Sequence, residues 1–211
     1  MKRRDVMKGA MGAAGLVMLP QVGLAQDAKT FKMAKRDVPP STPGKMDVVE
    51  FFWYGCPHCY AFESKLNQWV KALPPDVVFT KVPVRWPTKR VNFEGHQKLY
   101  YALEAMNRLA DLHLKVFEAM HKDKKLLATD AEIFDFAQSL GLNREAFANA
   151  FKSFAVSAKC AKAASLMESY DIEGVPTLGI GGKFSTSATQ AGSEDKVLVI
   201  AQDLIKRRRQ G

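Results

Sequence analysis

The chain has 211 residues, of which 47% are apolar and 25% are charged. This length and composition are typical of one soluble globular domain, or of a small domain with an insertion, and argue against a disordered or membrane-spanning protein. The formal net charge is +9, and four of the positive charges form a run at residues 206–209. Because no aromatic residues separate these charges, a solvated helix end is favoured over a nucleic-acid-binding surface.

Residues 1–25 have the three-part order of an export signal. A basic start at residues 2–4 is followed by an apolar stretch at residues 9–19 and by a small-residue cleavage site at Ala25-Gln26. The apolar stretch is too short to cross a bilayer, which argues against an uncleaved anchor. The Arg3-Arg4 pair also resembles a twin-arginine pattern, so the Tat and Sec export routes both stay open. We therefore expect cleavage near Ala25-Gln26 and a destination outside the cytoplasm.

The first half of the mature chain predicts a strand, a helix and a second strand. Residues 30–34 predict a short first strand, and the Pro-rich residues 39–44 predict an irregular link. The apolar, β-prone run from Val48 to Trp53 predicts a strand buried on both faces. Apolar residues then recur at helical spacing from Phe62 to Leu73. Residues 77–82 predict a second buried strand, which completes a parallel β-α-β unit with a right-handed crossover.

The second half predicts a helical block and a β-β-α unit. Residues 93–170 show helical periodicity without a strand signal, including a capping box at Thr129 and Glu132 and a helix stop at Gly141. Two strands, 177–180 and 183–187, are expected on either side of a two-residue turn at Gly181-Gly182. Ser193 is a candidate cap for a last helix. This element order indicates the α/β fold class, and several α/β folds share it.

The residues that carry chemistry are Cys56-Pro57-His58-Cys59, at the start of the predicted helix. Two cysteines at this spacing can form a small disulfide. The unpaired N–H groups at a helix N-terminus stabilise the thiolate of Cys56, Pro57 suits the first helical turn, and His58 places an imidazole near the sulfur. A stabilised thiolate makes the disulfide a stronger oxidant. We therefore expect oxidation of substrates, with Cys56 as the reactive sulfur and Cys59 as its less exposed partner.

Other roles for the cysteines stay open at this point. A structural disulfide closing so short a loop would contribute little stability. A zinc site needs four ligands, and although the sequence has no second Cys-x-x-Cys motif, Cys56, Cys59, Cys160 and a distant His could supply them. A Cu(I) site with two thiolates is a further option. Cys160 lies on a helical stripe with Val156 and Met167, which favours a buried structural thiol over a redox or dimer-forming role.

The segment from Phe51 to Cys59 resembles the redox centre of the DsbA family, the periplasmic disulfide oxidases of the thioredoxin superfamily. Gly174-Val175-Pro176-Thr177 resembles the cis-proline loop of that family, and the helical block lies where the family inserts its helical domain. The resemblance covers about residues 48–207. It implies a thioredoxin fold (βαβ…ββα) with an inserted all-helical domain, in which residues 1–25 are the export signal, 26–91 and 171–211 the thioredoxin-like domain, and 92–170 the helical insertion.

The resemblance also implies roles for individual residues. The catalytic pair would be Cys56 and Cys59, and the redox potential would be tuned by Pro57, His58, Glu50 and Lys81. Substrate would bind at Val175 and Pro176, where the Val175 backbone would pair with an extended peptide. Glu50 and Lys81 match a buried acid and base that could relay a proton to or from Cys59, although a structural ion pair at the end of the sheet is an equal alternative. Trp53-Tyr54-Gly55 and Thr177 depart from the best-known members, which leaves substrate preference open.

The expected function is therefore a periplasmic dithiol-disulfide oxidase that donates the Cys56-Cys59 disulfide to exported polypeptides with free thiols. A DsbB-like membrane quinone reductase would recharge it, no metal or other cofactor is expected, and we expect a monomer without a nucleic-acid partner. One alternative is a disulfide isomerase or reductase, although about 22 residues between the cleavage site and the redox strand are too few for the dimerisation domain of such isomerases. The other is a thiol-based metal-binding module.

Overall fold

The computed structural model describes residues 30–88 and 90–210, so the predicted export signal and its cleavage site lie outside the described residues. The strands are β1 (Lys32–Met33), β2 (Met46–Phe52), β3 (Val77–Pro83), β4 (Thr177–Ile180) and β5 (Phe184–Ser187). The helices are α1 (Pro57–Lys71), α2 (Phe93–Ala105), α3 (Leu109–His121), α4 (Asp130–Ser139), α5 (Arg144–Phe151), α6 (Phe154–Tyr170), α7 (Ala188–Ala191) and α8 (Glu194–Gln210). No helix in this part of the chain is both long and apolar enough to cross a bilayer.

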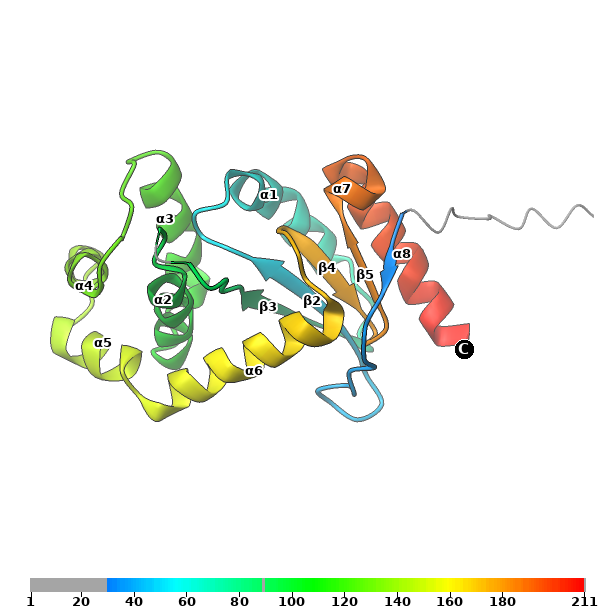
Figure 1. Ribbon diagram of the computed structural model, residues 1–211, viewed down its shortest axis with the longest axis horizontal. Coiled ribbons are helices and arrows are strands. Elements are labelled where there is room, and N and C mark those ends of the chain that lie inside the picture. Colours follow the sequence, from blue (N-terminus) through cyan, green and yellow to red (C-terminus); the bar gives the residue numbers. More distant parts are fainter. Residues whose placement is uncertain (1–29, 89, 211) are drawn as a thin grey trace, which may run out of the picture.

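The five strands form one mixed sheet in the order β1-β5-β4-β2-β3 (Figure 1). β2 and β3 are parallel and are joined through α1, as the β-α-β pattern predicts, whereas the other neighbouring strands are antiparallel. β2 has a neighbour on each side, and its residues 48–52 are all buried. The prediction of a strand buried on both faces is therefore confirmed for β2.

The second predicted strand is not buried as expected. β3 lies at the edge of the sheet, its first three residues are half-buried and Thr80 is exposed, and only Val82 and Pro83 are buried among its seven residues. A run of β-branched residues indicates a strand but does not tell whether a neighbour covers its second edge. The position of β3 follows from the topology, because β4 returns on the other side of β2.

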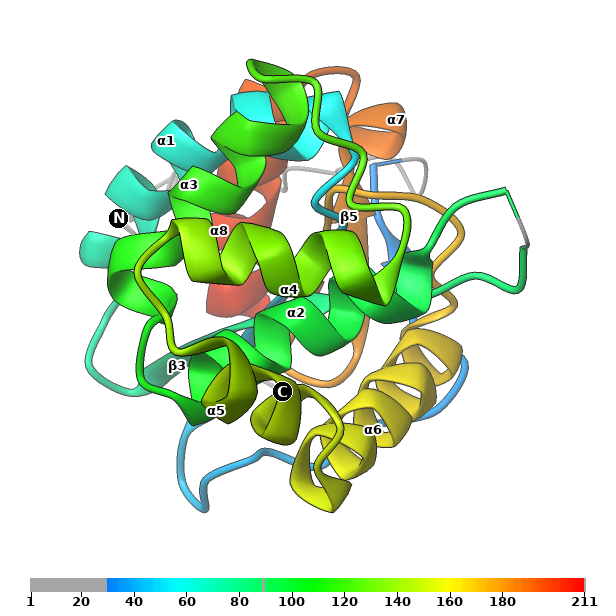
Figure 2. The same ribbon diagram turned by 90° about the vertical axis from the view of Figure 1, so that its left-hand side faces the viewer.

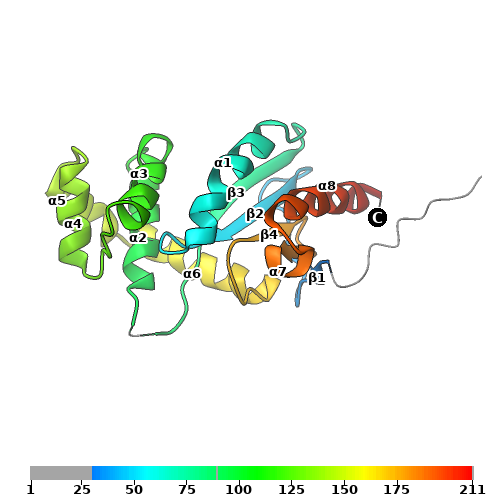
Figure 3. The same cartoon turned by 90° about the horizontal axis from the view of Figure 1, so that it is seen from above.

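Two layers of helices cover the sheet (Figure 3). α1 and α8 pack on one face, where Leu66 and Leu204 share a buried cluster with Val48 and Ile180. α6 crosses the opposite face, and Tyr170 at its end packs edge-on against Phe51 with ring centroids 5.4 Å apart. The sheet is therefore buried between helices, which explains the apolar sequence of its central strand.

Helices α2 to α5 gather at one end of the molecule, which faces the viewer in Figure 2. Helices α2 to α6 follow one another without a strand between them, as the periodicity predicts. The predicted cap is present: the Thr129 side chain accepts the Glu132 N–H at 3.2 Å, whereas the Glu132 carboxylate accepts the N–H of Ala128, at 2.9 Å, rather than that of Thr129. Gly141 follows α4 with a φ of +82°, as a helix stop requires.

The hairpin between β4 and β5 differs from the expected two-residue turn. Ile180 pairs with Phe184, so three residues, 181–183, lie between the paired positions. The N–H of Val38 donates to the Gly182 carbonyl at 2.9 Å, and a Cβ at Gly182 would lie 2.0 Å from the Val38 carbonyl oxygen. The conformation of the turn therefore depends on its contact with Val38, at the start of the irregular link. Turn rules based on local sequence do not include such a contact between distant segments.

The last helix begins where the sequence predicts. Ser193 caps α8 by accepting the Lys196 N–H at 3.3 Å. The basic run at its end is not simply solvated, because Arg209 forms an ion pair with Asp76 at 2.6 Å and Arg208 donates to the Gly181 carbonyl at 3.1 Å. Both contacts hold the end of α8 against the sheet.

Candidate active site

Cys56 is the N-cap of α1. Its backbone is extended (φ −86°, ψ 114°), its sulfur accepts the Cys59 N–H at 3.3 Å, and Pro57 is the first residue of the helix. A capping group at this position receives N–H groups that have no partner within the helix, and the helix dipole favours a negative charge there. The strand-to-helix turn thus presents the Cys56 sulfur where a thiolate is stabilised.

The two cysteines are in the dithiol form and are chemically unequal. The hydrogen bond from the Cys59 thiol lowers the pKa of Cys56 to about 7, against the opposing effect of burial and with help from the backbone N–H groups of Cys59 and His58. Cys59 is fully buried, and burial together with the hydrogen bond to Cys56 raises its pKa. Near neutral pH, Cys56 is therefore the cysteine that ionises, whereas Cys59 stays a thiol.

A loop from a distant part of the chain faces the cysteines. The Val175-Pro176 peptide bond is cis, and the Val175 carbonyl oxygen lies 3.5 Å from the Cys56 sulfur. The Thr177 hydroxyl closes the loop by donating to the Gly174 carbonyl at 2.7 Å. A groove of about 570 Å³ runs along this loop and is lined by Lys32, His58, 171–177, Ser185 and 187–190. The groove is lined by the cis-proline loop and by His58, two residues after Cys56.

His58 is more exposed than its position in the motif suggests. Its side chain is 78% exposed, and its Nδ1 lies 3.7 Å from Glu194 Oε1 at the start of α8. Its backbone N–H and its charge both help to lower the pKa of Cys56, but less than the Cys59 thiol does. The imidazole therefore acts on the sulfur from the surface rather than through a direct contact.

Glu50 and Lys81 form a buried ion pair. They are register partners on β2 and β3, in the interior of the seven-pair ladder rather than at the end of the sheet, and Lys81 Nζ lies 2.6 Å from Glu50 Oε2. Glu50 is completely buried. Burial raises its pKa to about 7, although the positive charge of Lys81 opposes this shift. A group that titrates near neutral pH in this environment is suited to accept and release a proton.

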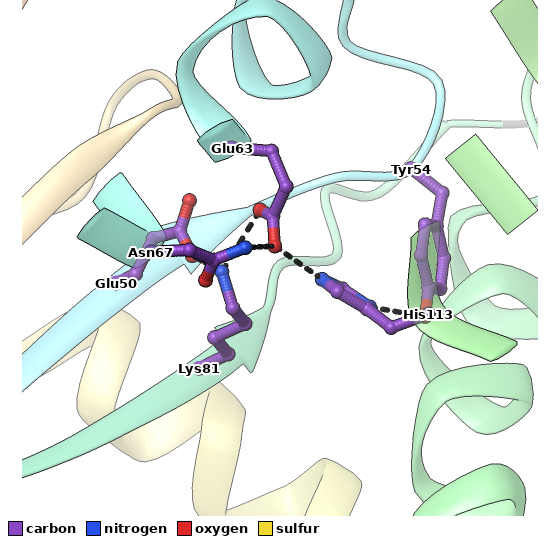
Figure 4. Close-up of polar contacts among 6 residues, drawn as sticks. All are labelled: Glu50, Tyr54, Glu63, Asn67, Lys81 and His113. Atoms are coloured by element: carbon purple, nitrogen blue, oxygen red, sulfur yellow. Dashed lines mark hydrogen bonds and ion pairs between the residues drawn. The ribbon is translucent and has the colours of Figure 1, made fainter. Parts of the chain in front are cut away.

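Sequence reasoning missed three neighbours of this pair (Figure 4). Glu63 Oε2 accepts a second hydrogen bond from Lys81 Nζ at 2.9 Å, and Glu63 Oε1 accepts one from Asn67 at 3.0 Å. His113 Nε2 lies 3.4 Å from Glu63 Oε1, and its Nδ1 lies 2.8 Å from the Tyr54 hydroxyl. Glu63 lies four residues after Cys59 on the buried face of α1, beside Phe62 and Leu66. A charged residue on an apolar helix face was the signal in the sequence that could have identified it.

Trp53 and Gly55, in the segment before Cys56, depend on each other. The Trp53 indole N–H donates to His96 Nδ1 on α2 at 2.9 Å. The ring then lies so close to Gly55 that a Cβ there would be 2.2 Å from it. The segment before Cys56 is thus anchored to the helical block, and only glycine fits beneath the indole.

Cys160 is not the buried thiol that the sequence predicted. It is half-buried on α6, and burial raises its pKa to about 11, so it is protonated at neutral pH. A helical stripe of small and apolar residues indicates the face of a helix but not how deeply each position lies. Among residues 30–88 and 90–210, no group of three or more His, Cys, Asp or Glu side chains is arranged to hold a metal ion.

Comparisons with known proteins agree with this geometry. A family model described as a DSBA-like thioredoxin domain matches residues 47–197. The Thiol:disulfide interchange protein DsbA of Pseudomonas aeruginosa is 37% identical over 209 residues, which cover 96% of this chain and 98% of that protein. The protein of the same name from Azotobacter vinelandii is 41% identical over 172 residues, or 82% of this chain and 79% of that protein. The crystal structure of Pseudomonas aeruginosa DsbA matches with a TM-score of 0.80 at 39% identity, covering 87% of this chain and 94% of that chain.

Proposed function

The chain belongs to the DsbA family of thiol:disulfide oxidoreductases, and we propose that it works as an oxidase that donates its Cys56-Cys59 disulfide to exported polypeptides. The predicted thioredoxin fold is confirmed by this membership and by the match to solved DsbA structures. The observation that carries the proposed direction is the capping geometry of Cys56, which stabilises its thiolate. A stabilised thiolate favours the dithiol state and therefore transfer of the disulfide to substrate.

The transfer proceeds through two exchange steps. A substrate thiolate attacks Cys56 Sγ, a substrate–Cys56 disulfide forms, and the Cys56–Cys59 bond breaks with its electron pair going to Cys59. A second substrate thiolate then attacks the substrate sulfur of the mixed disulfide, and Cys56 leaves as a thiolate. The substrate loses two electrons, and the enzyme gains them. The disulfide is the only redox group needed, so the enzyme requires no cofactor or metal.

The environments of the two sulfurs suit these roles. Cys59 is buried and its pKa is raised, so it takes up a proton when it leaves and does not compete as a nucleophile. Glu50 is the candidate donor of that proton, because its own pKa is raised to about 7. The Val175 carbonyl beside Cys56 is the candidate acceptor for a backbone N–H of a substrate bound as a short strand.

The cellular context is part of the proposal. The named relatives are DsbA proteins, whose family exchanges disulfides with substrate thiols in the periplasm. The export signal at residues 1–25 supports the same compartment for this chain, reached by the Tat or the Sec route. A DsbB-like membrane quinone reductase would return Cys56 and Cys59 to the disulfide. We propose a monomer with a thioredoxin-like domain at 26–91 and 171–211 and a helical insertion at 92–170.

The redox potential tests the direction of the reaction. The purified protein would be equilibrated with glutathione buffers of graded ratio, and the disulfide fraction would be measured by alkylation and mass. We expect a couple far more oxidising than that of thioredoxin, which is about −270 mV. A potential close to the thioredoxin value would refute the oxidase and leave a reductase.

A further inference from the structure

His113 is a buried imidazole that the exchange steps do not use. It comes from α3 in the helical block, yet it points toward the β-α-β unit that carries the cysteines (Figure 4). The titratable or charged groups that face it are Glu63 on α1, Lys81 on β3, Tyr100 on α2 and Tyr54 in the segment before Cys56. Phe52 and Phe117 pack against its ring at 5.3 and 5.2 Å. A buried polar group in such surroundings needs a partner for each ring nitrogen.

The contacts of His113 define which nitrogen carries its proton. Burial lowers the pKa of His113 more than the hydrogen bond to Glu63 raises it, so the ring is neutral at neutral pH. Burial also raises the pKa of Tyr54, so the hydroxyl keeps its proton and donates it to Nδ1. The ring proton is then on Nε2, which lies 3.4 Å from Glu63 Oε1, within ion-pair distance, and makes no hydrogen bond of good geometry with any described residue. His113 therefore directs an N–H toward Glu63.

Glu50 and Glu63 both accept a hydrogen bond from the Lys81 ammonium group, but they differ in how many other donors face them. Glu63 faces three donors, from Lys81, Asn67 and His113. Glu50 accepts only from Lys81, and its Oε1 has no hydrogen-bond partner among the described residues. Two buried carboxylates beside one cation do not both ionise readily, so the pair retains one proton. The proton stays on the carboxyl with fewer donors, which is Glu50.

The directions of the pKa shifts of Glu50 and Glu63 agree with this difference in the number of donors. Burial would raise the pKa of Glu63, but the hydrogen bond from His113 and the charge of Lys81 lower it to about 2. Burial raises the pKa of Glu50 to about 7. The charge of Glu50 also acts on Cys59, and that of Cys56 acts on Glu50. The protonation of Glu50 is thus coupled to both cysteines.

We propose that His113 is a positioning residue that keeps Glu63 ionised and thereby places the shared proton on Glu50, the carboxyl coupled to the cysteines. The proposal rests on the proposed function, because it assigns the proton that Cys59 receives when it leaves. It gives the helical block a part in the reaction: a residue of α3 sets the charge beside a redox pair on α1. If the proton moved to Glu63, an ionised Glu50 would disfavour the Cys56 thiolate and make the disulfide a weaker oxidant.

Two variants separate the hydrogen bond from the packing of the ring. In His113→Gln, the side-chain amide can reach the position of Nε2 and still donate to Glu63. In His113→Asn, the amide reaches only the position of Nδ1, which keeps a partner for Tyr54 and loses the donor to Glu63. Carboxyl ¹³C shifts of ¹³C-glutamate-labelled, reduced protein would be followed from pH 3 to pH 9, with Glu50→Gln and Glu63→Gln used to assign the two signals. Circular dichroism would establish that each variant is folded.

We expect His113→Asn to lower the Glu50 midpoint by one unit or more, to raise the Glu63 midpoint, and to raise the midpoint of the Cys56 thiolate absorbance. His113→Gln should stay close to the wild-type values. Unchanged midpoints in a folded His113→Asn, or equal shifts in both variants, would overturn the proposal. If His113→Asn does not fold, Glu63→Gln serves instead: it should lower the Glu50 midpoint, because Lys81 then serves Glu50 alone, and an unchanged midpoint would refute the proposal.

These titrations do not depend on catalysis. The carboxyl midpoints are equilibrium properties of the reduced protein, whereas the proposed oxidase function is tested by the glutathione equilibrium of the wild type. A wild-type potential near that of thioredoxin would refute the oxidase without changing where the proton resides. A normal potential with unshifted midpoints in His113→Asn would refute only the role of His113.

Discussion

The Cys56 sulfur lies 3.5 Å from the carbonyl oxygen of Val175, although 119 positions separate the two residues in the chain. This contact joins the helix N-terminus that activates the thiolate to the loop that would hold a substrate backbone. The reactive sulfur and the candidate peptide-binding loop are therefore brought together by the fold and not by either motif alone.

Removal of either cysteine should give a different and diagnostic defect. The Cys59→Ala variant retains the activated Cys56 but lacks the sulfur that resolves a mixed disulfide. Incubated with oxidised glutathione, it should accumulate a stable glutathione adduct on Cys56, detected by intact mass. Cys56→Ala is the matched control and should form no such adduct at neutral pH, because burial raises the pKa of Cys59. Equal labelling of the two variants would contradict the assignment of Cys56 as the reactive sulfur.

The Cys56 thiolate should contribute stability to the reduced protein that rises with pH between about 7 and 9. The pKa of Cys56 is lowered from 9.0 to about 7 on folding, so within this window Cys56 binds more protons in the unfolded chain than in the folded one. The thiolate then contributes up to about 2–3 kcal/mol above pH 9, and this contribution is lost as the pH falls through 7. Because the raised pKa values of Cys59 and Cys160 give an opposite slope near pH 9, the reduced Cys56→Ser variant is the reference. Urea unfolding should show that the stability of the reduced wild type relative to Cys56→Ser rises across this window.

Removal of the Lys81 ammonium should destabilise the protein strongly. In Lys81→Met, the ionised carboxyl of Glu63 stays buried without the cation that it shares with Glu50, and breaking a buried ion pair in this way costs about 3–5 kcal/mol. The loss should be smaller near pH 4, where the carboxyl takes up a proton. The double variant Lys81→Met with Glu63→Gln should recover part of the stability at pH 7, as measured by urea unfolding. No recovery would mean that charge is not the cause.

Gly55→Ala should displace the Trp53 indole. A Cβ at position 55 would lie 2.2–2.7 Å from three ring atoms, so the ring must move and its hydrogen bond to His96 must weaken. We expect a loss of about 1–3 kcal/mol in unfolding free energy and altered tryptophan fluorescence. Gly174→Ala is the control, because a Cβ there meets nothing within 4 Å. Similar losses in the two variants would indicate a general effect of replacing glycine.

Trp53 and Gly55 also show how the fold constrains a segment that the motif leaves free. The sequence around both residues gives no indication of what holds them. The constraint is the hydrogen bond from Trp53 to His96, which belongs to α2 and lies 43 positions away. A contact at that separation leaves no periodic pattern in the sequence, so it becomes visible only when the helical block is placed against the sheet.

The sequence by itself determined the redox pair, its place at a helix N-terminus and the order of strands and helices. These features depend on residues within one or two turns of each other: the capping position of Cys56, the apolar run of β2 and the caps at Thr129 and Ser193. The buried acid and base at Glu50 and Lys81 were expected only through the family resemblance, and the structure pairs them.

Only the tertiary structure decided which side chains complete the site and how deeply each element is buried. It placed β3 at the edge of the sheet, left Cys160 half-buried, and brought Glu63 and His113 to the Glu50–Lys81 pair. Each of these outcomes depends on packing between segments far apart in the chain. Local propensity and spacing describe what a segment prefers, whereas burial and the protonation of a shared site depend on which other segments surround it.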